Sequence, residues 1–263
     1  MELKQIFDIS DEKPLDRIVD DGGFAGIFRT IGCIGDSLSS GEFEAKKADG
    51  TKSYHDYYEY SWGQYLGRMI GSKVYNFSRG GMTAKEYIND FAEHWRYWSS
   101  DYACQAYIIA LGVNDLFGRK QPLGSLDDVD FDNYENNNRE TFAGCYAYII
   151  QRLKKTQPRA RFFLMSMPRG NDDREDLRKA HADFLNQLAE KFDKTYVIDL
   201  NKYAPVYDEE FRELFYLGHM TPAGYMVTAK MVASYMDYII RHNMKDFKQV
   251  GFIGTDLYYE EEK

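Results

Sequence analysis

The sequence has few cysteines and no excess of basic residues. Its three cysteines, Cys33, Cys104 and Cys145, form no Cys-x-x-Cys pair, so reduced, buried thiols are expected rather than a disulfide framework. Lys and Arg number 33 against 42 Asp and Glu, which gives a formal net charge of −9. Without a basic excess, binding to a nucleic-acid backbone or to an anionic membrane surface is not expected.

Long apolar runs are also missing. The longest, residues 106–111, is far shorter than the ~20 residues that cross a bilayer. Residues 1–10 carry acids and lack the apolar core of a signal peptide, so a cytoplasmic location is expected. A chain of 263 residues can bury roughly three quarters of its unfolded surface. We therefore expect one domain over residues 1–263, with a polar leader at 1–27.

Short apolar runs alternate with longer amphipathic ones. The short runs are mostly apolar rather than alternating, which is typical of strands covered on both faces. The alternation predicts an α/β fold with a parallel sheet and helices on both sides. The predicted strands are residues 28–34, 73–77, 106–111, 161–165 and 195–200, and the predicted helices cover 84–98, 142–153, 177–192 and a last one from Thr221-Pro222 to about 239.

Two stretches show no regular pattern. Residues 118–139 are rich in Asp and predict either a solvated surface loop or a rim over a site. Residues 39–54 follow the first predicted strand and lead into a tyrosine-rich segment with Tyr54, Tyr57, Tyr58 and Tyr60. These tyrosines could stack on sugar rings, line an acyl pocket or pack as a helix face.

Polar residues follow the carboxyl ends of the predicted strands, where open parallel sheets bind ligands. Ser37 follows the first strand, Gly81 the second and Asn114 the third, and His219 precedes the last helix. Ser37 is the candidate nucleophile and His219 its general base. The backbone N–H groups of Ser37 and Gly81 and the Asn114 amide could form an oxyanion hole. This set predicts acyl transfer and calls for no cofactor or metal.

These motifs resemble the blocks of the GDSL, or SGNH, hydrolase family. The resemblance rests on Gly35-Asp36-Ser37-Leu38, on Asn76 with Gly81, on Gly112-Val113-Asn114-Asp115 and on Gly218-His219, in this order along residues 29–240. It implies a flavodoxin-like three-layer α/β/α sandwich with five parallel strands. It also implies ester hydrolysis through an acyl-serine intermediate, with Ser37, Gly81, Asn114 and His219 as the site residues. From the tyrosine-rich segment, the substrate could be an acetylated carbohydrate; a small metabolite is the alternative.

One position departs from the family pattern. The aspartate that usually stands three residues before the histidine is Tyr216 here. A backbone carbonyl could orient His219 instead, the protein could be a weak hydrolase or an inactive binding module, or another acid could reach the ring. The acids considered are Asp208, Glu209, Glu210 and Glu213.

Other functions and sites are less favoured. A nucleotide- or flavin-binding protein is disfavoured because no Gly-x-Gly-x-x-Gly or Gly-Lys-Ser/Thr motif occurs. An α/β-hydrolase is disfavoured because no Gly-x-Ser-x-Gly elbow occurs. The remaining histidines show no metal-ligand spacing. Asp36 and Asp115 are expected to cap turns rather than to hold a metal.

Overall fold

The computed structural model describes residues 11–251, and it confirms the predicted fold class. Five parallel strands form the central sheet. Numbered along the chain, their spatial order is 2-1-3-4-5, the flavodoxin-like order, in which ligands bind where the first and third strands separate. In that order the strands are β4 (Lys73–Asn76), β1 (Thr30–Gly35), β5 (Ala106–Ala110), β6 (Arg161–Met165) and β7 (Thr195–Ile198).

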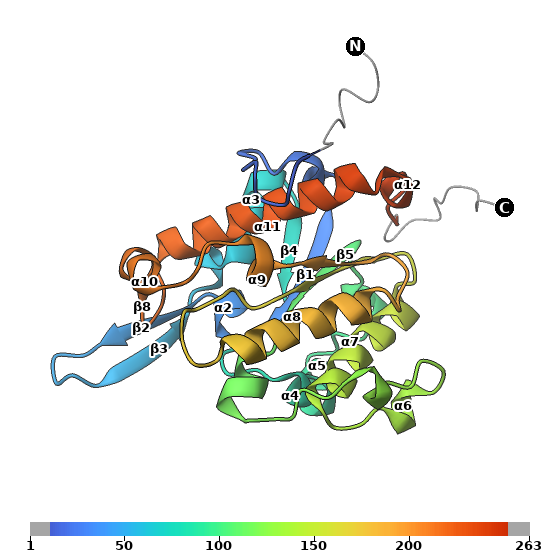
Figure 1. Cartoon of the computed structure of the whole chain (residues 1–263), viewed down its shortest axis with the longest axis horizontal. Coiled ribbons are helices and arrows are strands. Elements are labelled where there is room, and N and C mark those ends of the chain that lie inside the picture. Colours follow the sequence, from blue (N-terminus) through green and yellow to red (C-terminus); the bar gives the residue numbers. More distant parts are fainter. Residues whose placement is uncertain (1–10, 252–263) are drawn as a thin grey trace, which may run out of the picture.

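Helices cover both faces of the sheet (Figure 1). Alternate strand residues face opposite layers: Ile31 and Cys33 pack toward α3 and α11, whereas Tyr107 and Ile109 pack toward α7 and α8. The first layer contains α3 (Trp62–Ile70), α11 (Pro222–His242), α12 (Met244–Phe247) and the turn η1 (Gly23–Ile27); the second contains α7 (Phe142–Thr156), α8 (Glu175–Ala189) and the short run α4 (Ala84–Glu86), η3 (Tyr87–Phe91) and α5 (Ala92–His94).

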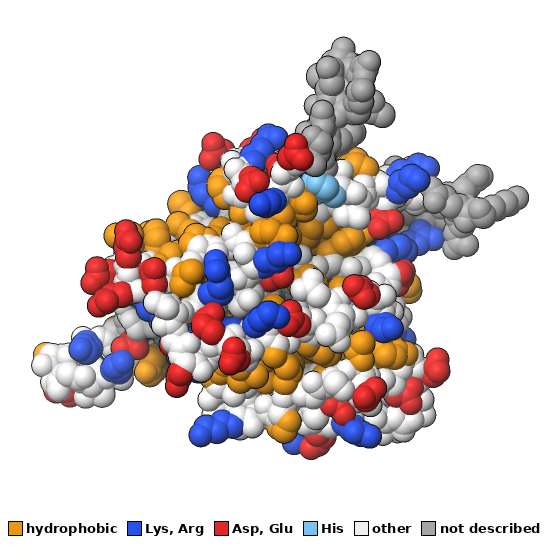
Figure 2. All heavy atoms as spheres, viewed as in Figure 1, with side chains coloured by type: hydrophobic (Ala, Val, Ile, Leu, Met, Phe, Trp, Pro, Cys, Tyr) orange, Lys and Arg blue, Asp and Glu red, His pale blue; other side chains and the backbone are white. Residues whose placement is uncertain are grey.

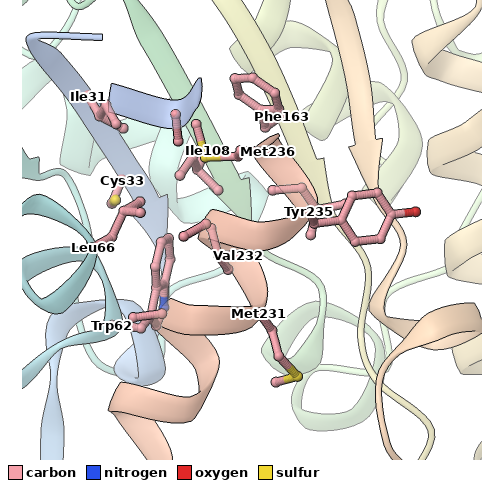
Figure 3. Packing of buried hydrophobic residues seen from close by; sticks show 14 of the residues in the cluster. Ile31, Cys33, Trp62, Leu66, Ile108, Phe163, Met231, Val232, Tyr235 and Met236 are labelled. Carbon is pink, nitrogen blue, oxygen red and sulfur yellow. The ribbon is translucent and has the colours of Figure 1, made fainter. Parts of the chain in front are cut away.

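Helix α11 determines the position of His219, which lies just before it in the chain. Its side chains Val232 and Met236 pack with Ile31 and Cys33 of β1 and with Trp62 of α3 in one buried cluster (Figure 3). The predicted start is confirmed: the Thr221 hydroxyl accepts from the backbone N–H of Gly224 at 3.2 Å, and Pro222 is the first helical residue. The apolar stripe and the cap together determine where His219 lies.

One predicted helix is shorter in the structure, and one helix of the structure was not predicted. The helix predicted at 84–98 ends at His94. The π-helical turn η3 within it shifts the phase of the apolar positions, and Trp95, expected on the buried face, is 53% exposed. Helix α3 was not predicted at all. It contains Gly63 and Gly67, where an added Cβ would lie 3.0 Å from Cys33 Sγ and 2.9 Å from the Ser72 carbonyl, so the glycines permit close packing at the expense of helix propensity.

Residues 39–54 are not irregular, as expected from the sequence, but contain most of a β-hairpin. Strands β2 (Glu42–Lys46) and β3 (Lys52–Asp56) pair antiparallel, with Glu42 opposite Asp56 and Glu44 opposite Tyr54. The hairpin projects from the body of the protein (Figure 1, left). Its strands alternate charged and aromatic side chains without an apolar run, which explains why the pattern was missed.

The remaining elements are short and lie in the connections. The stretch 118–139 contains two of them and packs on α7 through Asp128, which accepts from Arg139 and Thr141. Within residues 11–251, no helix is both long and apolar enough to cross a membrane. The short elements are α2 (Ser37–Ser40), η2 (Tyr58–Tyr60), η4 (Ser100–Tyr102), η5 (Asn114–Gly118), η6 (Leu126–Asp128), α6 (Tyr134–Asn137), α9 (Leu200–Tyr203), α10 (Glu209–Phe215), β8 (Tyr216–Leu217) and β9 (His219–Met220).

Gly41 joins α2 to the hairpin and provides a test of this arrangement. Its φ is +78°, and an added Cβ would lie 2.7 Å from the Tyr57 carbonyl oxygen. Gly71 has a similar φ of +66° with nothing within 4 Å. We expect Gly71→Ala to lower the free energy of unfolding by about 1–2 kcal/mol, the cost of left-handed backbone. Gly41→Ala should lower the free energy of unfolding clearly more, because the backbone around Tyr57 must also move. Equal losses for the two variants in urea unfolding would contradict this arrangement.

Candidate active site

Ser37 and His219 come together at the carboxyl end of the sheet. Ser37 opens α2 directly after β1, where the Asp36 carboxylate caps the turn by accepting from the Leu38 N–H at 3.1 Å. His219 lies in β9, three residues before α11. The two elements place Ser37 Oγ 3.1 Å from His219 Nε2. This is the distance at which a histidine can take the proton of a serine hydroxyl.

A third residue, which the sequence did not reveal, contacts the same nitrogen. Glu42 Oε1 of strand β2 lies 3.1 Å from His219 Nε2, and both side chains are largely buried, with 15% and 21% exposed. Burial raises the pKa of the Glu42 carboxyl above its usual value, the neighbouring His219 acts in the opposite direction, and Asp56 raises it further. Glu42 is therefore a carboxylate on the serine side of the imidazole ring.

The other ring nitrogen of His219 has no acceptor. Nδ1 is buried and has no hydrogen-bond partner among the described residues, so a backbone carbonyl does not orient the ring. The four acids considered from the sequence do not pair with it either; Asp208, for example, accepts from the Phe211 N–H at 3.1 Å. Instead the Tyr54 ring packs edge-on against the imidazole, with 5.8 Å between centroids.

Tyr216 stands in β8 and does not contact His219 through any hydrogen bond. It pairs with Met220 across the β8–β9 hairpin. Its ring packs against Tyr207 and Phe211, and burial raises its pKa above the usual value. Tyr216 is therefore part of an aromatic cluster, and it supplies no substitute for the missing carboxylate.

The predicted oxyanion-hole residues lie on the loops beside Ser37. Asn114 Nδ2 lies 3.2 Å from the Met82 carbonyl and 3.4 Å from Asp36 Oδ2. It thereby ties the loop after β5 to those after β4 and β1. Gly81 has a φ of +73° and open space where a Cβ would stand. Its neighbour Gly80 is different, because a Cβ there would overlap with the Glu42 carboxylate.

Asp36 and Asp115 cap turns, as expected. Asp115 Oδ1 accepts from the Ala84 N–H at 2.7 Å, whereas its Oδ2 has no partner in the described part of the chain. Burial raises the pKa of Asp36 to about 6 and that of Asp115 to about 7. Across residues 11–251, no three His, Cys, Asp or Glu side chains are grouped so that they could hold a metal ion.

A cavity of about 300 Å³ opens beside Ser37. Asp36 and Leu38, the two neighbours of Ser37, line it, as does Val113 next to Asn114. Tyr216 and Met220 line it from the β8–β9 hairpin. Most of the wall is apolar, and none of residues 118–139 belongs to it, so the structure gives no support for that stretch as a rim of this cavity.

The tyrosine-rich segment divides between two roles. Tyr54 is 53% exposed beside His219. Tyr57 and Tyr60 pack against Phe43 of the hairpin, and the Tyr58 hydroxyl donates to the Val74 carbonyl at 3.0 Å. Of these four tyrosines, Tyr54 is the one that contacts the His219 ring. The four do not form one helix face, because the segment between Tyr57 and Trp62 contains only the short turn η2.

Comparison with known proteins agrees with this geometry. The model of the GDSL-like lipase/acylhydrolase family matches residues 33–227, which include Ser37, Gly81, Asn114 and His219. The chain belongs to this family. Membership makes it a carboxylic ester hydrolase of the GDSL type, as predicted. No curated protein matches this GDSL-like hydrolase in sequence.

Solved structures share the fold of this GDSL-like hydrolase at low sequence identity. A family two carbohydrate esterase from Clostridium thermocellum, in complex with cellohexaose, has a TM-score of 0.55 and 15% identity over 83% of this chain. The match covers 65% of that esterase. A possible lipase from Chitinophaga pinensis has a TM-score of 0.51 and 16% identity, over 81% of this chain and 98% of its own. A family three carbohydrate esterase from Clostridium thermocellum has a TM-score of 0.52 and 14% identity, over 81% of this chain and 97% of its own.

The buried Asp115 gives a prediction about stability and pH. Its native pKa of about 7 lies above the usual value of 3.8, so the native state favours the protonated carboxyl. The stabilisation is full below about pH 4 and is lost as the pH rises through 7. Asp115→Asn should therefore gain stability relative to wild type between pH 5 and pH 8, by at least about 1 kcal/mol in urea unfolding.

The control for this experiment is Asp127→Asn, an exposed carboxyl whose side chain makes no hydrogen bond in the structure. Its difference from wild type should be the same at both pH values. A constant difference for Asp115→Asn as well would show that this carboxyl is already ionised at pH 5 in the native protein.

Proposed function

We propose that the protein cleaves carboxylic esters through an acyl-Ser37 intermediate. The observation that supports this most directly is the 3.1 Å contact between Ser37 Oγ and His219 Nε2. Ser37 Oγ attacks the ester carbonyl while His219 Nε2 takes the hydroxyl proton. His219 then gives this proton to the leaving alcohol, and water cleaves the acyl-serine by the same steps in reverse order.

The oxyanion that forms at the carbonyl needs donors that are already in place. We assign this role to the backbone N–H groups of Ser37 and Gly81 and to Asn114 Nδ2. The hydrogen bond from Asn114 to Met82 holds the amide between these loops before substrate binds. The open space over Gly81 is where the carbonyl oxygen would enter.

Glu42 replaces the charge of the absent aspartate, although it contacts Nε2 of His219 rather than Nδ1. When His219 carries the serine proton, its Nε2–H lies beside Glu42 Oε1, and the carboxylate stabilises the positive ring. The unpartnered Nδ1 supports a second candidate, an inactive binding module on the same fold. The Glu42 contact favours the enzyme, because it provides a charge where the imidazolium forms.

The alcohol half of the substrate should lie on the His219 side of Ser37, where the leaving oxygen must receive its proton. The exposed Tyr54 ring stands there and could stack on a sugar. A carbohydrate ester is thus the substrate class we favour. The esterase of this fold that is seen with cellohexaose agrees with this assignment.

The nucleophile can be tested by labelling and turnover. We expect a fluorophosphonate to add mass at Ser37, and Ser37→Ala to lower the hydrolysis of p-nitrophenyl acetate by at least about a thousandfold. Ser100→Ala, at an exposed serine in η4, should react like wild type. If wild type neither reacts with the fluorophosphonate nor releases p-nitrophenol, the esterase is contradicted and the inactive binding module is supported.

The role of Glu42 can be tested with a charge-neutral isostere. Glu42→Gln should lower kcat by roughly tenfold at neutral pH, because a charged hydrogen-bond partner is worth about 1.5–3 kcal/mol. The difference from wild type should shrink in acid, where Glu42 itself is protonated and loses its charge; its raised pKa brings this pH closer to neutrality.

Glu44→Gln is the matched control, since Glu44 lies on the same hairpin and pairs with Lys52 rather than with His219. It should leave the pH profile unchanged. A higher kcat for Glu42→Gln would contradict the assigned role, because it would mean that Glu42 competes with Ser37 for Nε2.

A further inference from the structure

The cavity beside Ser37 has both apolar and charged side chains in its wall. Leu38, Trp62, Met165 and Met220 are among the apolar ones. Its other lining residues include four arginines: Arg169, Arg174, Arg178 and Arg212. In a chain with a net charge of −9, four arginines around one cavity point to a ligand with negative charge.

Two of these arginines are fully paired. Arg178 is buried, and its Nη1 and Nη2 donate to the two oxygens of Asp172 at 2.5 and 2.8 Å. Arg174 Nη2 donates to Asp172 Oδ2 at 2.7 Å. Both guanidinium groups lie over the Phe117 ring, at 4.9 Å for Arg174 and 5.3 Å for Arg178. Arg178 Nη1 also donates to Glu175 Oε1 at 2.6 Å, so two carboxylates balance these two guanidinium groups and leave little positive charge for a ligand.

The other two have no carboxylate partner within residues 11–251. Arg212 donates from Nε to the Tyr207 carbonyl at 3.0 Å, and its guanidinium carbon lies 5.4 Å from the centre of the Tyr216 ring. Arg169 makes no side-chain hydrogen bond or ion pair in that part of the chain, and its backbone carbonyl accepts from the Tyr207 N–H at 2.8 Å. Both arginines thus join the backbone of Tyr207, and all three residues line the cavity.

The acids of α10 do not neutralise this pair. Figure 2 shows Asp and Glu side chains gathered over α10 at the left of the view. Glu209, Glu210 and Glu213 are exposed and bind neither arginine. Two exposed arginines that lack an acid partner in the wall of a mostly apolar cavity match an apolar chain that ends in a carboxylate.

We infer that the cavity binds the acyl half of the ester, and that the substrate is a half-ester of a dicarboxylic acid, whose free carboxylate pairs with Arg169 and Arg212. The inference rests on the proposed function. The acyl half is the part assigned here because the alcohol leaves on the His219 side, whereas Asp36, Leu38 and Val113 place the cavity beside Ser37 and Asn114. Hydrolysis then yields the alcohol and the dicarboxylate, with water supplying the oxygen of the new carboxyl group.

Two p-nitrophenyl esters of the same shape test whether the free carboxylate of the acyl group is recognised. 4-Nitrophenyl hydrogen adipate carries the carboxylate, and 4-nitrophenyl adipamate replaces it with a neutral amide. We expect kcat/KM for the adipate to exceed that for the adipamate by about tenfold, with the ratio falling as salt is added. The double variant Arg169→Gln/Arg212→Gln should abolish the preference and leave adipamate hydrolysis within about twofold of wild type.

Arg17→Gln/Arg68→Gln is the matched control, because it makes the same change in net charge at two exposed arginines outside the cavity. It should keep the preference. Equal rates for the two esters in wild type, or a preference that survives the Arg169/Arg212 change, would overturn the inference while leaving ester hydrolysis intact.

A binding measurement separates failure of this inference from failure of the proposed function. Monomethyl adipate is titrated calorimetrically into Ser37→Ala, in which turnover is removed. Binding that is lost when Arg169 and Arg212 are also replaced supports the cavity assignment even if wild type neither labels nor hydrolyses esters. No detectable binding, with adipamate cleaved normally by wild type, overturns it.

Discussion

The packing of α11 across the first layer is the constraint on which the site depends. Val232 and Met236 anchor the helix against β1 and α3, and the cap at Thr221 begins it three residues after His219. Ser37 follows the carboxyl end of β1, the strand against which α11 packs. The hydrophobic layer therefore fixes Ser37 and His219 relative to each other, although they are far apart in the chain.

The β2–β3 hairpin supplies two groups that contact His219. It brings Glu42 to the imidazole nitrogen and packs the Tyr54 ring edge-on against the imidazole. Gly80 permits this approach because a side chain there would occupy the space of the Glu42 carboxylate. The imidazole is thus held by Glu42 on the serine side and by the Tyr54 ring, rather than by an acid at Nδ1. This arrangement differs from a serine–histidine–aspartate triad in the direction from which the charge acts.

The sheet and three of the long helices could be predicted because their signals are local. Strands buried on both faces read as apolar runs, and α7, α8 and α11 each show one apolar stripe. The contact between Ser37 and His219 could be anticipated because Ser37 follows a strand end and His219 precedes the last helix. Glu42 could not, because its strand has no apolar run and its contact with His219 depends on how two hairpins meet. Arg169 and Arg212 could not be linked for the same reason, since their shared hydrogen-bond partner is the backbone of Tyr207, in a connection between helices.

The β8–β9 hairpin separates two environments with two adjacent side chains. His219 points toward Glu42 and Tyr54, whereas Met220 points into the cavity lined by Leu38 and Tyr216. Met220 can therefore be replaced without removing a group that contacts His219. Under the proposed function the two side chains serve different halves of the ester, so that preferences for these halves can diverge independently among descendants of this chain.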